Sequence, residues 1–248
     1  MSTRNHSERR CVMVALLLSL PSAYADVIVG QFDPAVPAVS APWQIIQLEK
    51  HVPATKFRSV HWDGHGAIEA QAQRSMALLG RPISVDLKVN PVLCWRWRID
   101  AVVKGADMNR RSGDDYAARV YVAFMLPRDE LTLLDKAALA VARGLYGPSV
   151  PDGALNYVWD NRHPVGTRRP NAYTNRAQMI VQRSGNDEAG QWVSERVNLQ
   201  DDAIAAFGSA EPKAVLVAIA SDSDNTGDSA RAGFADLHLV GRNERCQF

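Results

Sequence analysis

The chain has 248 residues, of which 46% are hydrophobic and 22% charged, and its formal net charge is +1 at pH 7. This balance of charge leaves no broad basic surface, so nucleic acid is not an expected partner. Beyond the first residues, no apolar stretch approaches the roughly 20 residues that cross a bilayer, so the mature chain is expected to contain no integral membrane segment.

The first 25 residues have the features of a Sec-type signal peptide. Three arginines precede a short apolar run at 11–20, and an A-x-A pattern of small residues ends at Ala25. Such a run is too short to span a bilayer as a mature helix, and the pattern suits signal peptidase. We therefore predict cleavage before Asp26 and a periplasmic or secreted bacterial protein.

The mature chain is expected to hold an extended segment at 26–42, rich in Pro, Ala and Val, followed by a single domain at 43–248. Two cysteines remain after cleavage, Cys94 and Cys246. An oxidising compartment permits a disulfide between them. The sequence does not establish one, because the geometry of the pair decides it.

From residue 43 onward, short runs that alternate apolar and polar residues predict β-strands. The first group of strands is expected at 43–49, 56–61, 67–73, 83–89, 93–99 and 116–124. Asp63-Gly64 lies between the second and third of these runs. It is a typical hairpin turn, because such turns need positive φ.

A helix is predicted near 128–145, where acidic residues come early and basic residues late. Its expected core-facing stripe consists of Leu131, Leu134, Ala138, Val141 and Leu145. A short helix is expected near 200–207. Further strands are expected at 157–159, 177–183, 191–199, 214–221 and 233–240. About ten short strands with one inserted helix indicate a mainly all-β, antiparallel sandwich of jelly-roll type.

Arginine and aromatic side chains alternate along the central strands. In "LCWRWRI" (93–99) the tryptophans share one face with the apolar residues, and the arginines share the other. If the central strands are neighbours, one exposed face gathers a ligand-binding set: Arg96, Arg98, Arg119, Tyr121, Tyr157 and Trp159. Guanidinium forks beside aromatic rings suit an anionic sugar. Alternatively, the arginines form ordinary surface ion pairs.

The segment "SDSDNTGD" (221–228) concentrates carboxylates between two strands. It departs from the EF-hand pattern, because Gly233 occupies the twelfth position, where a bidentate Glu is needed, and its flanks predict strands. A calcium site of another kind needs a second loop. Its candidate ligands are Asp114, Asp115, Asp222, Asp224 and Asn225. The same residue types also form ordinary turns.

A catalytic interpretation pairs Asp222 or Asp224 with Asp114 or Asp115 as the acid and base of a glycosidase. That chemistry requires two carboxylates at a set separation across a cleft. The chain contains no nucleophile elbow G-x-S-x-G and no H-E-x-x-H zinc motif. We therefore assign no catalytic residue from the sequence.

Five segments occur in a characteristic order: "LCWRWRI", "GDDYAARVYVAF", "LNYVWD", "VSERVNLQDDAIAAFG" and "VAIASDSDNTGDSARAGFADLHL". They resemble the domain-of-unknown-function 3047 family of exported bacterial proteins, over the span from about Trp43 to Leu239. The resemblance implies one secreted domain, with a jelly-roll-like sandwich, and it implies no activity.

Three functions share this scaffold, because fold does not decide function. We rank first a non-catalytic module that binds an envelope or extracellular glycan. An envelope protein-interaction or structural module comes second, and a carboxylate-dependent glycan hydrolase or lyase comes third. The sequence establishes no cofactor, and calcium is the candidate for which the acidic loops offer ligands.

Overall fold

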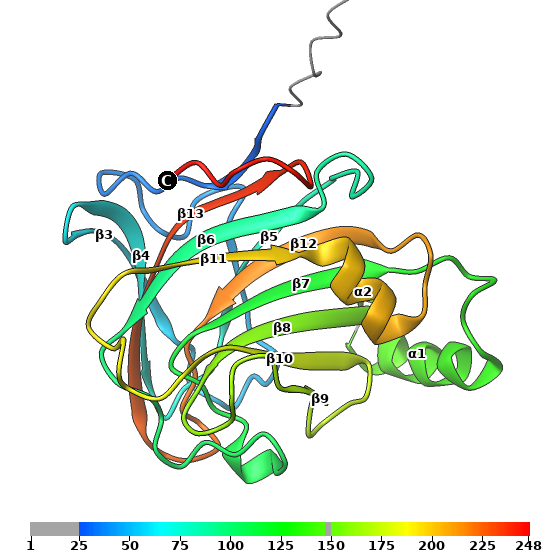
Figure 1. The fold of residues 1–248 in the computed structure, drawn as a ribbon. Helices are drawn as coiled ribbons and strands as arrows, with labels where there is room; N and C mark the ends of the chain where they lie inside the picture. Colours follow the sequence, from blue (N-terminus) through cyan, green and yellow to red (C-terminus); the bar gives the residue numbers. More distant parts are fainter. Residues whose placement is uncertain (1–24, 147–149) are drawn as a thin grey trace, which may run out of the picture.

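A computed structural model describes residues 25–146 and 150–248. The predicted signal peptide therefore lies almost wholly outside the described residues. Two packed β-sheets make up the body of the protein (Figure 1). Neither helix in the described part of the chain has the length and hydropathy that a membrane crossing requires.

The first sheet has six strands. In spatial order they are β11 (Val193–Asn198), β6 (Val92–Ile99), β13 (Ser229–Val240), β4 (His65–Gln73) and β3 (Lys56–Trp62), with β1 (Val27–Gly30) also paired to β13. Because β1 adds to this sheet and Val29 enters the core, the extended segment at 26–42 takes part in the sandwich.

The second sheet has seven strands. In spatial order they are β2 (Gln44–Ile46), β5 (Leu78–Pro82), β12 (Lys213–Ala220), β7 (Arg119–Met125), β8 (Gly153–Asp160), β10 (Ala177–Ser184) and β9 (Arg168–Pro170). Every pairing is antiparallel except that of β8 with β10, which is parallel. The predicted fold class, a mainly antiparallel β-sandwich, is confirmed.

Aromatic side chains from both sheets form the centre of the core. Trp95 and Trp97 of β6 are fully buried, as strand alternation predicts. The Trp95 ring lies 5.6 Å from the ring of Tyr157, and the Trp97 ring 5.7 Å from the ring of Trp159. Each tryptophan of the six-stranded sheet thus contacts an aromatic residue of the seven-stranded sheet.

One predicted strand is wrong. Residues 83–89 alternate apolar and polar side chains but form no strand, and β5 lies just before them at Leu78–Pro82. Val85 and Leu87 are nonetheless buried in the core. The segment makes one backbone hydrogen bond to β12, from the Ile83 N–H to the Val215 carbonyl, and then enters a turn at 87–89, so its alternation does not reflect a strand.

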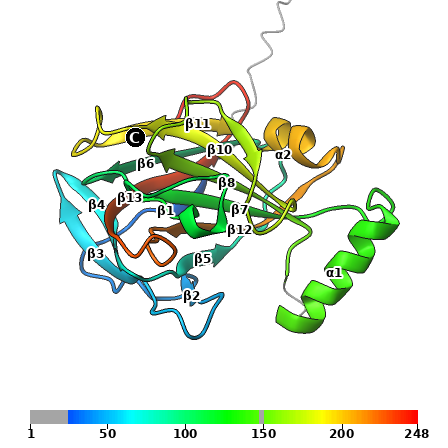
Figure 2. The same cartoon turned by 90° about the horizontal axis from the view of Figure 1, so that it is seen from below.

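The inserted helix, α1 (Leu133–Tyr146), overlaps the predicted range 128–145. Of its predicted core-facing stripe, Leu131 is buried but precedes the helix, and the rest of the described stripe is wrong. Leu134 is 84% and Val141 65% exposed, whereas Leu139 is buried. The helix projects from one end of the sandwich (Figure 2). It is held by Leu139 and by the Arg143–Asp152 and Arg176–Asp135 ion pairs, so most of its apolar face points outward. The side chain of Leu145 is outside the described ones.

The second predicted helix, α2 (Leu199–Phe207), is confirmed. The Asn198 side chain accepts a hydrogen bond from the Asp201 N–H at its start, and Gly208 ends it with a φ of 68°. These are the capping residues that such a helix requires. The predicted hairpin turn is also present, with φ values of 47° at Asp63 and 86° at Gly64.

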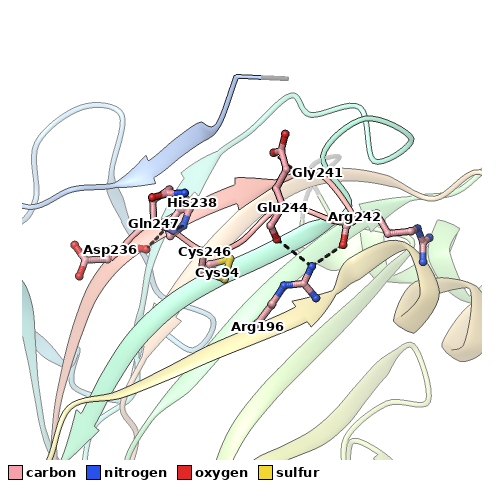
Figure 3. The surroundings of a disulfide bond; sticks show 9 residues. All are labelled: Cys94, Arg196, Asp236, His238, Gly241, Arg242, Glu244, Cys246 and Gln247. Carbon is pink, nitrogen blue, oxygen red and sulfur yellow. Dashed lines mark hydrogen bonds between the residues drawn. A yellow bond between two sulfur atoms is a disulfide. The ribbon is translucent and has the colours of Figure 1, made fainter. Parts of the chain in front are cut away.

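Cys94 of β6 and Cys246 form a disulfide, with 5.8 Å between their Cα atoms (Figure 3). It attaches the segment Gly241–Phe248 to the outer face of the six-stranded sheet. This segment lies at the top of Figure 1, whereas the loop after β12 lies at the bottom, at the opposite end of the sandwich.

Candidate functional site

The loops that carry the two acidic stretches meet. The short 3₁₀ turn η1 (Arg111–Gly113) leads into Asp114 and Asp115 before β7, and Ser221–Asp228 links β12 to β13. The Asp115 carboxylate accepts hydrogen bonds from the Asn225 N–H at 3.2 Å and from the Thr226 N–H at 2.5 Å. We call the resulting cluster the loop-end site. It consists of Asp114, Asp115, Arg119, Asp222, Asp224, Asn225 and Tyr173.

Strand pairing explains why Arg119 and Asp222 come together. The register pairs Arg119 of β7 with Ala220 of β12, so Asp222 follows just beyond the end of that ladder. The Arg119 Nε donates to Asp222 Oδ1 at 2.8 Å, and its Nη2 donates to Asp222 Oδ2 at 2.5 Å. Both side chains are buried, on the face of the seven-stranded sheet that is turned away from the core.

Both members of the Arg119–Asp222 pair make further hydrogen bonds to the loop before β7. The Tyr116 N–H also donates to Asp222 Oδ1, and the Asp114 carbonyl accepts from Arg119. The Tyr116 ring lies under the guanidinium, 4.4 Å from it. Burial raises the pKa of Asp222 well above its ordinary value, and the Arg119 charge opposes that shift. A buried, bidentate and fully hydrogen-bonded pair of this kind holds two loops in one geometry.

Asp224 differs from its two acidic neighbours. Its Oδ2 accepts one hydrogen bond from the Asn225 amide at 2.9 Å, while its Oδ1 has no partner among the described residues. Burial, and next the negative charge of Asp115, raise the pKa of Asp224. That Oδ1 is buried, so Asp224 is the carboxylate of the loop-end site with a buried acceptor that no described residue satisfies.

The rim of the site comes from a third loop, between β9 and β10. Tyr173 is 46% exposed, and its hydroxyl hydrogen-bonds to Asn225 Oδ1. The Arg111 guanidinium lies over the Tyr173 ring, 5.2 Å from its centre. Asn171 Nδ2 donates to Asp114 Oδ2 at 2.9 Å and so attaches this loop to the one before β7.

Sequence reasoning missed Tyr173, Asn171 and Arg111. The signal available was "NAYTNR" (171–176), in which turn-forming residues flank one aromatic residue. Nothing in that pattern indicates which of the other loops it contacts, because the contact depends on the order of strands in the sheet.

The predicted calcium ligands are only partly brought together. One oxygen each from Asp115, Asp222 and Asp224 lie within 4.8 Å of one another. Asp114 and Asn225 instead accept hydrogen bonds from Asn171 and Tyr173. Calcium takes six to eight oxygen ligands, and the Arg119 guanidinium already places a positive charge on Asp222. Calcium at this site stays a prediction, with those three carboxylates as the residues that would hold it.

The expectation that six arginine and aromatic residues share one exposed face is wrong, because β6 and β7 belong to different sheets. Arg96 and Arg98 lie on the outer face of the six-stranded sheet, where they pair with Asp236 and Asp63. Only Arg119 and Tyr121 belong to the loop-end region, where the Arg119 Nη1 donates to the Tyr121 hydroxyl at 3.1 Å.

Tyr157 and Trp159 lie on the inner face of β8 and are 0% and 1% exposed. The Tyr157 hydroxyl donates to Asp202 Oδ2 of α2, and the Trp159 Nε1 donates to the Gly185 carbonyl. The sequence predicts correctly that the two side chains share one face of the strand, but it assigns them to the exposed face and not to the inner one. Both residues support the core and are not available to a ligand.

The sequence profile described as "Protein of unknown function (DUF3047)" matches residues 41–238. The chain belongs to this family. The match begins after β1 and ends within β13, and it includes both acidic loops of the DUF3047 chain. No curated protein matches the sequence.

Among solved structures, the family 11 carbohydrate-binding module of the cellulase Lic26A-Cel5E of Clostridium thermocellum matches the DUF3047 chain with a TM-score of 0.42 and 9% identity, over 91% of this chain and 100% of that one. The family 12 endoglucanase 3 of Trichoderma harzianum matches with a TM-score of 0.37 and 8% identity, over 81% of this chain and 99% of that one. A family 12 xyloglucanase of Bacillus licheniformis matches with a TM-score of 0.35 and 11% identity, over 87% of this chain and 91% of that one. All three TM-scores are below 0.5, so the proposals below rest on the residues of this chain.

Proposed function

We propose that this protein binds a glycan of the bacterial envelope or extracellular space at the loop-end site, without cleaving it. The observation that carries the proposal is the Tyr173 ring, which is 46% exposed and whose hydroxyl is held by Asn225. Asn225 follows Asp224, whose buried Oδ1 has no partner among the described residues. An exposed ring held beside polar groups is the feature that a sugar surface requires.

Each part of the rim has a role in such binding. The exposed Tyr173 ring offers an apolar surface for the C–H face of a pyranose, and its hydroxyl end stays polar. Asp224 Oδ1 is buried, so the loop must shift before it accepts a sugar hydroxyl, and that bond then removes the cost of an acceptor without a partner. The Arg119–Asp222 pair beneath holds these groups in place, which limits the entropy lost when a ligand binds.

Binding without cleavage is favoured because the carboxylates are not equivalent. Cleavage by paired carboxylates needs two groups free to act as acid and base or nucleophile. Both oxygens of Asp222 are bonded to Arg119, and both oxygens of Asp115 accept backbone N–H groups. Asp224 is left as a single carboxylate with an oxygen that is unpaired among the described residues and buried, so the site does not offer the two free carboxylates that cleavage needs.

The protein is proposed to act in the periplasm or outside the cell. The Sec-type signal pattern at 1–25 supports this location, and the Cys94–Cys246 disulfide is compatible with an oxidising compartment. A glycan ligand would then be a component of the envelope or an exopolysaccharide.

The test is a screen of the purified protein against envelope and extracellular oligosaccharides, followed by calorimetry on the best ligand. Tyr173→Ala and Asp224→Ala are each expected to weaken binding by about tenfold or more, since each removes a direct contact. Asp228→Asn, an exposed residue of the same loop, is the matched control and should bind as wild type does.

Wild-type affinity in both Tyr173→Ala and Asp224→Ala would refute the proposed site. Each titration is repeated with EDTA and with added calcium, which shows whether a cation takes part. Product analysis of the same mixtures tests the enzyme alternative. If the wild type cleaves the glycan, and Asp224→Asn still binds it but no longer cleaves it, the protein is a hydrolase or lyase and not a binding module.

A second candidate, an envelope protein-interaction module, is favoured by helix α1. Leu133 and Leu134 are both 84% exposed, and Val141 is 65% exposed on the same projecting helix (Figure 2). Exposed apolar side chains that gather on one element are typical of interaction surfaces. Self-association in sizing experiments that disappears in Leu134→Ser, with α1 still helical, would support this alternative.

A further inference from the structure

A groove of about 450 Å³ lies at the other end of the molecule, between β11 and the segment Gly241–Phe248. Ser194 and Arg196 contribute from β11, and Glu244, Arg245 and Phe248 contribute from the segment. Its size is within the range of small-ligand sites. It contains no residue of the loop-end site.

The wall formed by Gly241–Phe248 is attached at several points (Figure 3). The Cys94–Cys246 disulfide fixes it to β6, and the Gln247 N–H donates to His238 Nε2 at 3.0 Å. The Arg196 Nη2 donates to the carbonyls of Arg242 at 2.6 Å and Glu244 at 3.3 Å. Arg196 therefore forms part of the floor and also supports the wall.

The charges that face the groove are unbalanced. Among the described residues, neither Arg196 nor Arg245 pairs with a carboxylate, and both are exposed. Glu244 is the one acidic side chain on the segment, and its Oε2 accepts the Gly241 N–H at 3.0 Å. Glu195 adds its backbone only, because its carboxylate points into the core, where it accepts from Trp97 Nε1 and Arg183 Nε.

An aromatic ring stands beside these guanidinium groups. Phe248 is 46% exposed, and the Arg96 guanidinium lies over its ring, 4.6 Å from the centre. Arg96 is in turn held by Asp236 at 3.2 Å. The ring is thus fixed in place from one side by Arg96 while part of it stays accessible.

We propose that this groove binds a carboxylate-bearing saccharide of the uronic acid class. The planar guanidinium of Arg196 or Arg245 matches the geometry of a carboxylate, and the exposed Phe248 ring contacts the apolar face of the sugar. This site is independent of the proposed function, because it differs from the loop-end site in position, in charge and in the residues that form it.

The test is calorimetry with trigalacturonate as the ligand, at low and at raised salt. Arg196→Gln combined with Arg245→Gln is expected to weaken binding by about tenfold or more. Arg242→Gln is the matched control, because Arg242 is paired with Asp201 at 2.8 Å and does not line the groove. The methyl-esterified trisaccharide, which lacks the carboxylate charges, is expected to bind at least about tenfold more weakly than trigalacturonate.

Unchanged affinity in the Arg196→Gln/Arg245→Gln protein, or equal affinity for the esterified ligand, would overturn the proposal. A triglutamate peptide that binds more tightly than trigalacturonate would overturn the assignment of a sugar. Asp224→Ala should leave trigalacturonate binding unchanged, so failure of this proposal is distinguishable from failure of the loop-end proposal.

The disulfide supplies a second, independent test. The Cys94→Ser/Cys246→Ser protein is expected to lose trigalacturonate binding, because the wall of the groove is no longer attached to β6. The near-ultraviolet tryptophan signal of the same protein should match that of the wild type, which shows that the sandwich remains folded. Full retention of trigalacturonate binding would place the ligand elsewhere.

Discussion

The two ends of the sandwich are held together by different chemistry. At the loop end, a buried ion pair between Arg119 and Asp222 joins β7 to the loop after β12. At the other end, a disulfide joins Gly241–Phe248 to β6, and the guanidinium groups of Arg196 and Arg245 stay exposed. The first device places charges inside the protein, where they must be paired. The second leaves charges available at the surface.

This difference predicts different sensitivities. A buried ion pair is strongly destabilised when one partner is removed, because the other charge is left buried without compensation. A disulfide acts mainly on the unfolded chain, so its removal weakens the fold without leaving an unsatisfied group in it. The loop end should therefore respond to substitution of charged residues, and the Gly241–Phe248 end should respond to reducing agents.

The largest effect is expected from Arg119→Met. The substitution leaves Asp222 buried with only the Tyr116 N–H as a partner, so the free energy of unfolding should fall by about 3–5 kcal/mol. Urea denaturation at pH 7 measures the loss. Arg111→Met, at an exposed arginine of the same region, is the control and should change stability by no more than about 0.5 kcal/mol.

The double variant Arg119→Met/Asp222→Leu tests whether the loss of stability in Arg119→Met comes from the unpaired charge of Asp222. It removes both charges, so it should be more stable than Arg119→Met alone. If Arg119→Met were as stable as wild type, the pair would not be what holds the two loops, and the contrast between the two ends would disappear.

The second-largest effect on stability is expected from loss of the disulfide. Its reduction should lower the free energy of unfolding by about 2–4 kcal/mol, because it closes a loop of 152 residues in the unfolded chain. Denaturation with and without a phosphine reductant measures this, and Cys94→Ser/Cys246→Ser provides the check. Cys94 and Cys246 pack with Val92 and Val240 in a small cluster apart from the main core, so the sandwich should stay folded. Loss of the near-ultraviolet tryptophan signal on reduction would contradict this.

Much of the fold was predictable from the sequence, because alternation is local. In 93–99 it placed Trp95 and Trp97 in the core correctly, and "DG" identified the β3–β4 turn. Which strands are neighbours is a long-range property, and the assumed adjacency of β6 and β7 was wrong. For the same reason Tyr157 and Trp159 were placed on a surface, although they contact the tryptophans of the opposite sheet.

The candidate site was predictable in part. The acidic loops were expected to meet if they formed a site, and Asp115 does bind the backbone of Asn225 and Thr226. Arg119 was expected to be exposed. It is buried, because the β7–β12 register brings Asp222 to it, and this pairing joins residues that are about a hundred positions apart. Tyr173 is missing from the predicted site because its contact with Asn225 also depends on the order of strands in the sheet.

The smallest effect concerns Asp224, the acidic residue of the loop end whose Oδ1 has no hydrogen-bond partner among the described residues. Its pKa is raised from 3.8 by burial and by Asp115, so the native protein binds more protons than the unfolded chain between pH 3.8 and the raised value. The stability of the wild type should therefore fall as the pH rises through that window. Asp224→Asn lacks this fall and should be the more stable protein at pH 7, by no more than about 1 kcal/mol.

Thermal and urea unfolding at pH 4 and pH 7 measure this difference, with Asp228→Asn as a control in the same loop. A variant that is less stable than wild type at pH 7 would mean that the Asp224 carboxylate contributes to the fold, as Asp222 does. Added calcium distinguishes a further case. A cation at Asp115, Asp222 and Asp224 would stabilise the wild type by mass action and leave Asp224→Asn nearly unchanged. The loop end would then be held by two buried cationic groups, the Arg119 guanidinium and a metal, and the buried Oδ1 of Asp224, unpaired among the described residues, would be a ligand of the metal.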